Sequence, residues 1–292
     1  MQPPKSSLRI GFSTDYDRNM LSPQVSQLPQ PALEHFQTYG WIRIRAAFTT
    51  EDAAAMCDVI WGALAKAGID RNDSSTWTKA RPDHLQYLKS DPVFHAIGSA
   101  RTISAIDGVL EGQSWERPRD WGAFFLQFPT GHKWDVPSSG WHLDGDYTGR
   151  LSPPCGVKVH AMLTDVGPHC GGMNIVSGSH RLVHRWFLEN PPAPGARGVQ
   201  LRKSLQRHPY LRDLFTAGDG DGGARIARFH ERVEEVDGIP LQVAENTASA
   251  GDVIVMHSLL LHAPPAAHPG THPRFLLNKD IHVGAWWEHS SL

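Results

Sequence analysis

Hydrophobic positions recur at helical spacing in the first third of the chain and fall into short, strand-like runs in the rest. Apolar residues three to four positions apart, acidic residues in a first turn, and glycine after the last periodic residue are signals for helix start and stop. They predict helices over 31–39, from Thr49 or Thr50 to Gly68, and over 93–110, with an alternating strand over 41–45.

Beyond about position 121, short β-like runs are separated by glycine and proline, with few helices between them. This texture is typical of a sandwich or barrel and disfavours an alternating βαβ array. The chain is therefore expected to be mainly β with N-terminal helices. The predicted strands cover 122–128, 156–164, 172–176, 239–243, 252–256 and 275–283.

Two segments do not fit this pattern. Positions 1–30 are rich in Pro, Ser and Gln without a sustained period, so they are expected to form an extended or disordered lead. Positions 189–237 are interrupted by proline and glycine around one short helical stretch, HPYLRDLF. Such an insertion beside a barrel is expected to serve as a lid, with a plain surface excursion as the alternative. The whole of 1–292 is interpreted as a single domain, with these two segments as its lead and its insertion.

Composition removes several classes of function. The formal net charge is −2, from 28 basic and 30 acidic residues, which gives no global reason to expect binding to nucleic acid or to an anionic membrane. Three cysteines without a C-x-x-C pair indicate a reducing, cytoplasmic setting, and no apolar run is long enough to span a membrane. Because there are 17 histidines, no argument from one histidine is strong.

The first candidate chemistry lies in the segment S-G-W-H-L-D-G-D. On a strand, His142 and Asp144 point to the same face, so an imidazole nitrogen and a carboxylate oxygen can meet one ion. Taken alone, one such triplet is expected by chance in this composition, and a hydrogen-bonded pair on a surface turn explains it as well.

A second segment about 120 positions later changes this balance. It reads G-D-V-I-V-M-H-S-L-L-L-H, and either His257 or His262 at its end can complete two histidines and one carboxylate on one face of an octahedral ion. Their odd spacing places them on opposite faces of a strand, so only one can bind. Arg274 then begins an apolar strand, where its planar fork suits a carboxylate.

Together these motifs resemble the phytanoyl-CoA dioxygenase-like family of Fe(II)- and 2-oxoglutarate-dependent oxygenases. The likeness runs from about 31 to 283 and rests on W-H-x-D-G, the G-G-M-N-I-V-S-G-S-H hairpin at 171–180, the run ending in His262, and P-R-F-L-L-N. The resemblance implies a double-stranded β-helix (a cupin-like jelly roll) that binds Fe(II) through His142, Asp144 and His262. It also implies that 2-oxoglutarate, held by Arg274, and O2 are co-substrates.

Details of the family pattern suggest further roles. The halogenating members have a small residue where this chain has Asp144, so halogenation is disfavoured. His160 falls where a side chain beside the co-substrate is expected. Pro264 replaces a hydroxyl residue that often touches 2-oxoglutarate, and Gln127 is a polar substitute whose alternative is an outward strand position.

Four further histidines are expected to have structural roles or to be exposed to solvent. His180 is expected to hydrogen-bond within its own turn, and His268, His272 and His289 are expected to be exposed.

The predicted function is hydroxylation, or another oxidation, of an unactivated C–H bond in a small or medium metabolite such as a natural product, with release of succinate and CO2. Asp146, Tyr147 and the 189–237 insertion are candidates for substrate contact. Two alternatives stay open: a non-catalytic jelly-roll binding protein, and a cupin-type metalloenzyme independent of 2-oxoglutarate.

Overall fold

The computed structural model of the 292-residue chain describes residues 28–144, 150–193, 196, 198–218, 222–265 and 268–283. The predicted lead at 1–30, apart from its end, and the candidates Asp146 and Tyr147 lie outside these ranges. No helix within them is long and apolar enough to cross a membrane.

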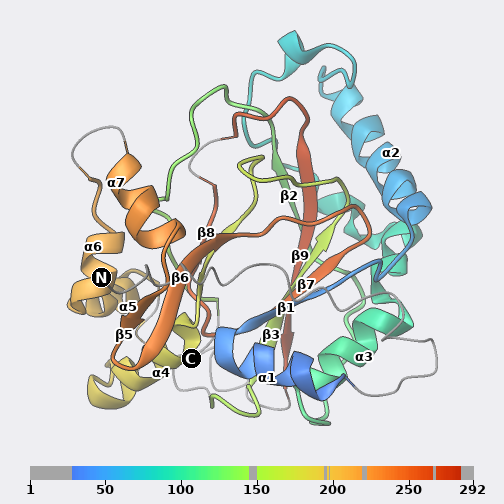
Figure 1. Cartoon of the computed structure of the whole chain (residues 1–292). Coiled ribbons are helices and arrows are strands. Elements are labelled where there is room, and N and C mark those ends of the chain that lie inside the picture. The colour runs from blue at the N-terminus through green and yellow to red at the C-terminus, as the bar shows by residue number, and fades with distance from the viewer. Residues whose placement is uncertain are drawn as a thin grey trace, which may run out of the picture.

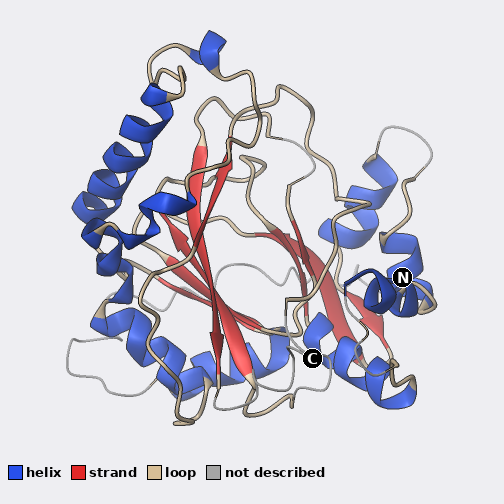
Figure 2. Ribbon diagram, turned by 180° about the vertical axis from the view of Figure 1, so that it is seen from behind, coloured by secondary structure: helices blue, strands red, loops and turns tan. Residues whose placement is uncertain are grey.

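Two antiparallel sheets form the centre of the molecule (Figures 1 and 2). The larger has the strand order β1-β7-β3-β9-β2 and the smaller the order β5-β6-β4-β8. Most predicted strands are confirmed to within a few residues. The larger sheet contains β1 (Trp41–Ile44), β2 (Ala123–Gln127), β3 (Gly156–Met162), β7 (Val253–His257) and β9 (Arg274–His282), and the smaller contains β4 (Asn174–Ser177), β5 (Glu234–Val236), β6 (Ile239–Glu245) and β8 (His262–Ala263).

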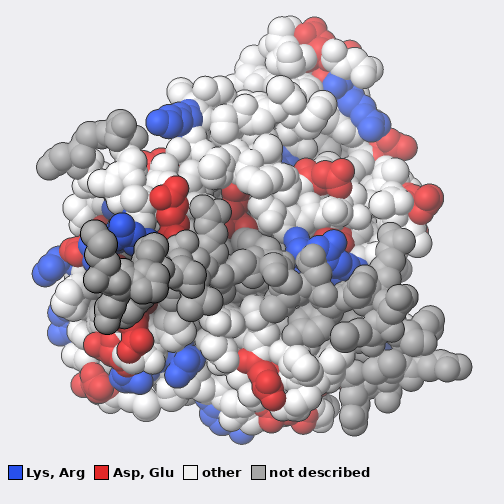
Figure 3. All heavy atoms as spheres, in the orientation of Figure 1, with Lys and Arg blue, Asp and Glu red and all other residues white. Residues whose placement is uncertain are grey.

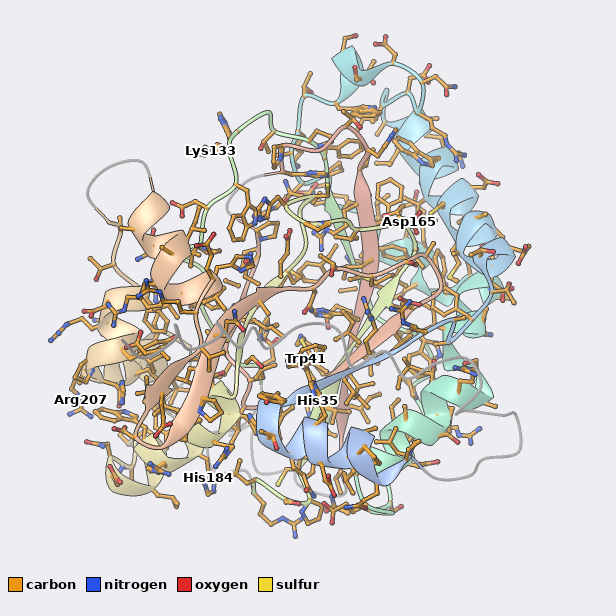
Figure 4. All side chains as sticks on the ribbon, viewed as in Figure 1. His35, Trp41, Lys133, Asp165, His184 and Arg207 are labelled. Carbon is orange, nitrogen blue, oxygen red and sulfur yellow. The ribbon has the colours of Figure 1, made fainter. Side chains whose placement is uncertain are left out.

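The two sheets pack face to face through an apolar cluster. Met162, Ile254 and Leu276 of the larger sheet meet Ile175 and Ala244 of the smaller one in this cluster. The indole of Trp41 on β1 also donates a 3.0 Å hydrogen bond to the Ser177 hydroxyl on β4. In Figure 4, Trp41 lies beside His35, and their rings are 4.9 Å apart. This mainly β, jelly-roll-like arrangement agrees with the predicted fold class.

The N-terminal helices cover the outer face of the larger sheet (Figure 2). The predicted start of the second helix is confirmed, because Thr49 and Asp52 form a reciprocal capping box. The single helix expected over 93–110 is wrong, since Ser99 has extended backbone and caps a new helix through the Thr102 N–H. The elements here are α1 (Gln30–Tyr39), α2 (Thr50–Lys66), η1 (Ser74–Thr76), η2 (Gln86–Ser90), η3 (Pro92–Gly98) and α3 (Ala100–Val109).

A second helical layer covers the outer face of the smaller sheet. Its apolar contacts include Leu211 and Phe229, which lie in the predicted 189–237 insertion, against Leu241 and Val243 of β6. In Figure 4, Arg207 and His184 lie at the periphery of this layer. A lid function for the insertion stays a prediction. The helices are α4 (Ser179–Glu189), α5 (Gly198–Leu205), α6 (Pro209–Leu214), α7 (Gly223–Arg225) and η4 (Ile226–His230).

The hairpin expected at 171–180 is instead a strand followed by a helix. β4 ends at Ser177, Gly178 adopts a φ of 84°, and α4 begins at Ser179. A side chain at position 178 would collide with the Pro240 carbonyl, so glycine is required there. The apolar residues Leu182, Val183 and Phe187 then place α4 against the sheet.

Candidate metal centre

His142 and His262 are brought together by backbone pairing. They form an isolated antiparallel bridge in which each N–H donates to the other's carbonyl, at 3.0 and 3.2 Å. Side chains of two directly opposed residues lie on the same face of a sheet. The imidazole centroids are accordingly 4.2 Å apart, although 120 positions separate the residues along the chain.

Both rings present the same nitrogen to the space between them. His142 Nδ1 is 2.7 Å from the Gly140 carbonyl and His262 Nδ1 is 3.0 Å from the Leu260 carbonyl. Each carbonyl accepts from Nδ1–H, which fixes the ring and leaves the Nε2 lone pair as a ligand. Burial lowers the pKa of His142, which favours the neutral imidazole that a metal ligand requires.

Asp144 completes the cluster. Its Oδ2 is 2.8 Å from His262 Nε2, and its Oδ1 is 3.7 Å from His142 Nε2. Burial opposes ionisation of this carboxyl, but the His262 hydrogen bond and the charges of His262 and Lys158 hold its pKa well below the usual value. Among the described residues, these three form the one cluster of ligand-type side chains whose atoms lie within 4.8 Å of one another.

The donor set fits a divalent transition metal. Two imidazoles and one carboxylate on one face leave the remaining positions of an octahedral ion free. The side chain of His142 is 43% exposed and that of His262 only 4%, so the cluster is open on one side. The predicted alternative, His257, is excluded from the cluster because it faces α1, where its ring lies 6.0 Å from that of Phe36.

Arg274 is a buried cation with unused donors. It is the first residue of β9, it is 3% exposed, and its Nε and Nη1 have no hydrogen-bond partner among the described residues. Burial and the nearby Arg81 lower its pKa to about 9, so it is charged at neutral pH. Glu245 offsets the charge of Arg274 in part, but no carboxylate is hydrogen-bonded to this guanidinium among the described residues. A buried charge without a hydrogen-bonded counter-ion is unfavourable, and an anionic ligand would remove that penalty.

Gln127 and His160, the two other predicted co-substrate contacts, face the same inner space. Gln127 on β2 is the register partner of Arg274, and its amide donates to the Phe128 carbonyl. His160 on β3 is 1% exposed, its ring centroid is 6.5 Å from that of His262, and its Nδ1 has no partner among the described residues. Burial, together with the charge of Lys158, holds the pKa of His160 well below its usual value.

Sequence reasoning missed two cations near these residues. Arg81, in the irregular segment after α2, donates to the Gln127 side-chain oxygen at 2.8 Å and to the Pro265 carbonyl at 3.1 Å. No periodic pattern marks this position. Lys158 binds Asp144. A signal existed for it, because Lys158 and His160 are polar residues two positions apart in a predicted strand and so share its face.

The expectations for other histidines are partly wrong. His180 lies with its Nε2 3.1 Å from the Gln37 carbonyl of α1, and its Nδ1 has no partner in the described part of the chain, so its hydrogen bond is not within its own turn. His268 is fully buried, and its Nε2 lies 2.8 Å from the carbonyl of His272, which is exposed as predicted. His289 lies outside the described residues. The tertiary packing of these loops, which local sequence does not encode, accounts for both errors.

The chain shares its fold with solved structures of HygX from Streptomyces hygroscopicus. With nickel and 2-oxoglutarate bound, HygX aligns with a TM-score of 0.53 and 17% identity over 88% of this chain and 87% of HygX. The iron-bound form gives 0.50 and 18% over the same shares. The form with nickel, 2-oxoglutarate and hygromycin B gives 0.50 and 16% over 88% of each chain.

No protein-family model matches the sequence, and a comparison with curated proteins gives no significant match. Membership of the phytanoyl-CoA dioxygenase-like family therefore stays a prediction. At these identities the likeness to HygX concerns the fold, and it agrees with the mainly β, jelly-roll-like architecture built from the two sheets.

Proposed function

We propose that the chain is a non-haem Fe(II)- and 2-oxoglutarate-dependent dioxygenase with a double-stranded β-helix of the phytanoyl-CoA dioxygenase-like type. One observation carries the proposal: the cluster of His142, Asp144 and His262 is open on one side, and Arg274 is a buried guanidinium whose Nε and Nη1 have no hydrogen-bond partner among the described residues. HygX, which shares the fold, binds nickel and 2-oxoglutarate together.

Each residue has a defined task in this proposal. The two Nε2 atoms and one Asp144 oxygen hold Fe(II), and Arg274 pairs with the far carboxylate of 2-oxoglutarate. Gln127 and His160 line the path between them. Bound iron supplies the oxidising chemistry, in which O2 and 2-oxoglutarate give one oxygen atom to a substrate C–H bond and release succinate and CO2.

The substrate is proposed to be a small or medium organic molecule. A cavity of about 690 Å³ lies between residues 114–120 and 279–282 and is lined by Trp115, Asp280 and His282, among others. Asp280 contacts Lys158, which in turn contacts Asp144, so the cavity adjoins the cluster. Hydroxylation is the preferred outcome.

An anaerobic titration tests the proposal. Metal-free protein receives Fe(II) and then 2-oxoglutarate, while the weak visible charge-transfer absorption of the chelate is recorded. The band is expected, and Arg274→Ala should need about 30-fold more 2-oxoglutarate or worse, because a buried charge pair is truncated. Arg71→Ala is the matched control, since Arg71 is exposed, pairs with Asp58 and lies over the Trp61 ring, away from the cluster.

His142→Ala should abolish iron-dependent succinate formation, and full activity in this variant contradicts the assigned ligand set. Iron binding without any band contradicts the oxygenase proposal and favours the cupin-type metalloenzyme. A protein that binds neither iron nor 2-oxoglutarate is best explained as a jelly-roll binding module.

A further inference from the structure

Lys158 is a buried lysine between two carboxylates. Its side chain is 5% exposed, and its Nζ lies 2.5 Å from Asp144 Oδ2, 3.1 Å from Asp280 Oδ1 and 3.0 Å from Asn278 Oδ1. An ammonium group has three N–H donors and no acceptor, so these contacts use its full capacity. Both partners on β9 face Lys158 because β3 and β9 pair in a register that opposes Lys158 and Asp280 directly.

Asp280 is chemically equivalent to the ligand Asp144. Both carboxylates contact the same nitrogen atom, so Asp280 is a second carboxylate that one shared lysine links to the cluster. A set of two histidines and two carboxylates would occupy a position that a bidentate co-substrate needs. It would also add a negative charge beside the place where an anion must bind.

Resting on the proposed function, we propose that Lys158 is a positioning residue that reserves the metal for Asp144 by neutralising Asp280 and holding it on β9. The same ammonium contacts Oδ2 of Asp144, the oxygen that also lies 2.8 Å from His262 Nε2, and so orients this carboxylate within the cluster. Lys158 thus keeps the ligand set at one carboxylate, and the Asn278 amide holds the lysine in place.

Removing the positive charge of Lys158 should change the affinities for a cation and for an anion in opposite directions. Removal of the ammonium leaves Asp280 unneutralised, so a divalent cation is expected to bind as tightly as before or tighter. 2-Oxoglutarate, which is a dianion, is expected to bind the metal-loaded protein more weakly. A purely structural role of Lys158 does not produce this split, because loss of the fold weakens both.

The test measures Mn²⁺ binding and then 2-oxoglutarate binding to the Mn²⁺-loaded protein by calorimetry. Lys158→Met should leave Mn²⁺ affinity unchanged or increased and weaken 2-oxoglutarate by about tenfold or more. The double variant Lys158→Met with Asp280→Asn should recover most of that loss. Lys79→Met is the control, because Lys79 is an exposed lysine that pairs with Asp83; it should change neither affinity beyond about twofold.

Unchanged 2-oxoglutarate binding in folded Lys158→Met, or a loss that Asp280→Asn does not recover, overturns the role of Lys158 and leaves the proposed function intact. A wild-type protein that binds no divalent cation overturns both. Where Lys158→Met melts below the titration temperature, Lys158→Gln replaces it with the same expectation, since its amide keeps a donor but carries no charge.

Discussion

The two faces of strand β3 are equally buried but differ in chemistry. Along β3, Val157, Val159 and Ala161 point to the helices, whereas Lys158 and His160 point to the smaller sheet, and all are at most 4% exposed. Apolar groups on the outer face stabilise the fold by leaving water. Charged groups on the inner face are costly to bury, so their presence there indicates binding rather than stability.

The strongest contrast lies between neighbours on β9. Phe275, directly after Arg274, packs on the outer face with its ring 5.1 Å from that of Trp61. Phe275→Ala should lower the free energy of unfolding by about 3–5 kcal/mol through lost burial and a cavity, measured by chemical denaturation. Metal and 2-oxoglutarate affinities should stay within about twofold. Arg274→Ala should show the reverse, and a comparable stability loss in both variants would break the comparison.

His257, which lies outside the cluster, allows a second test, because its buried imidazole makes the free energy of unfolding depend on pH. His257 accepts from the Leu259 N–H at Nδ1, its Nε2 is 3.2 Å from the Leu151 carbonyl, and burial lowers its pKa to about 4. Below pH 6.5 the unfolded chain binds a proton that the folded chain does not. Stability from this group is therefore complete above pH 6.5 and falls by about 3 kcal/mol as the pH drops to 4.

Unfolding free energies at pH 7.5 and pH 4, for wild type and His257→Gln, test this expectation. The variant cannot titrate at this position, so its decline should be smaller by about that amount. Equal declines would show that His257 is not the group responsible.

Arg81 and Arg274 give the smallest expected difference. Arg81 is mostly exposed and already donates to Gln127 and Pro265. Because water screens an exposed charge, Arg81→Ala should weaken 2-oxoglutarate binding only about three- to fivefold, measured by the same titration as for Arg274→Ala. Lys79→Ala, which removes an exposed charge from the same segment, is the control. A loss as large as that of Arg274→Ala would make Arg81 part of the carboxylate clamp.

The sequence predicts what alternation and short motifs encode. It predicts most strands of the two sheets and the jelly-roll-like class. The spacing of His142 and Asp144 alone does not distinguish a metal site from a surface pair, and the full cluster with His262 is predicted through the family resemblance. It does not predict the bridge between His142 and His262, because that contact depends on the path of 120 intervening positions. The contact between Arg81 and Gln127 is not predicted for the same reason, because the two residues are 46 positions apart.

Charge on the molecular surface adds little to the identification of partners. On the face shown in Figure 3, basic and acidic side chains are interspersed, in keeping with the net charge of −2. The informative charges are the inner ones, Lys158 and Arg274, which no surface view displays. In related sequences, the signal to look for is therefore a pair of polar residues at alternate positions of a strand that is otherwise apolar.

The bridge between His142 and His262 also has a mechanical meaning. A cation held by both imidazoles is a cross-link that closes a loop of about 120 residues, and closing a long loop restricts the unfolded chain in the way a disulfide does. A ligand that binds only the folded state also stabilises it by mass action. A bound metal would then be a reversible cross-link between two distant parts of the chain. Metal binding would stabilise the folded state, and folding would in turn form the metal site.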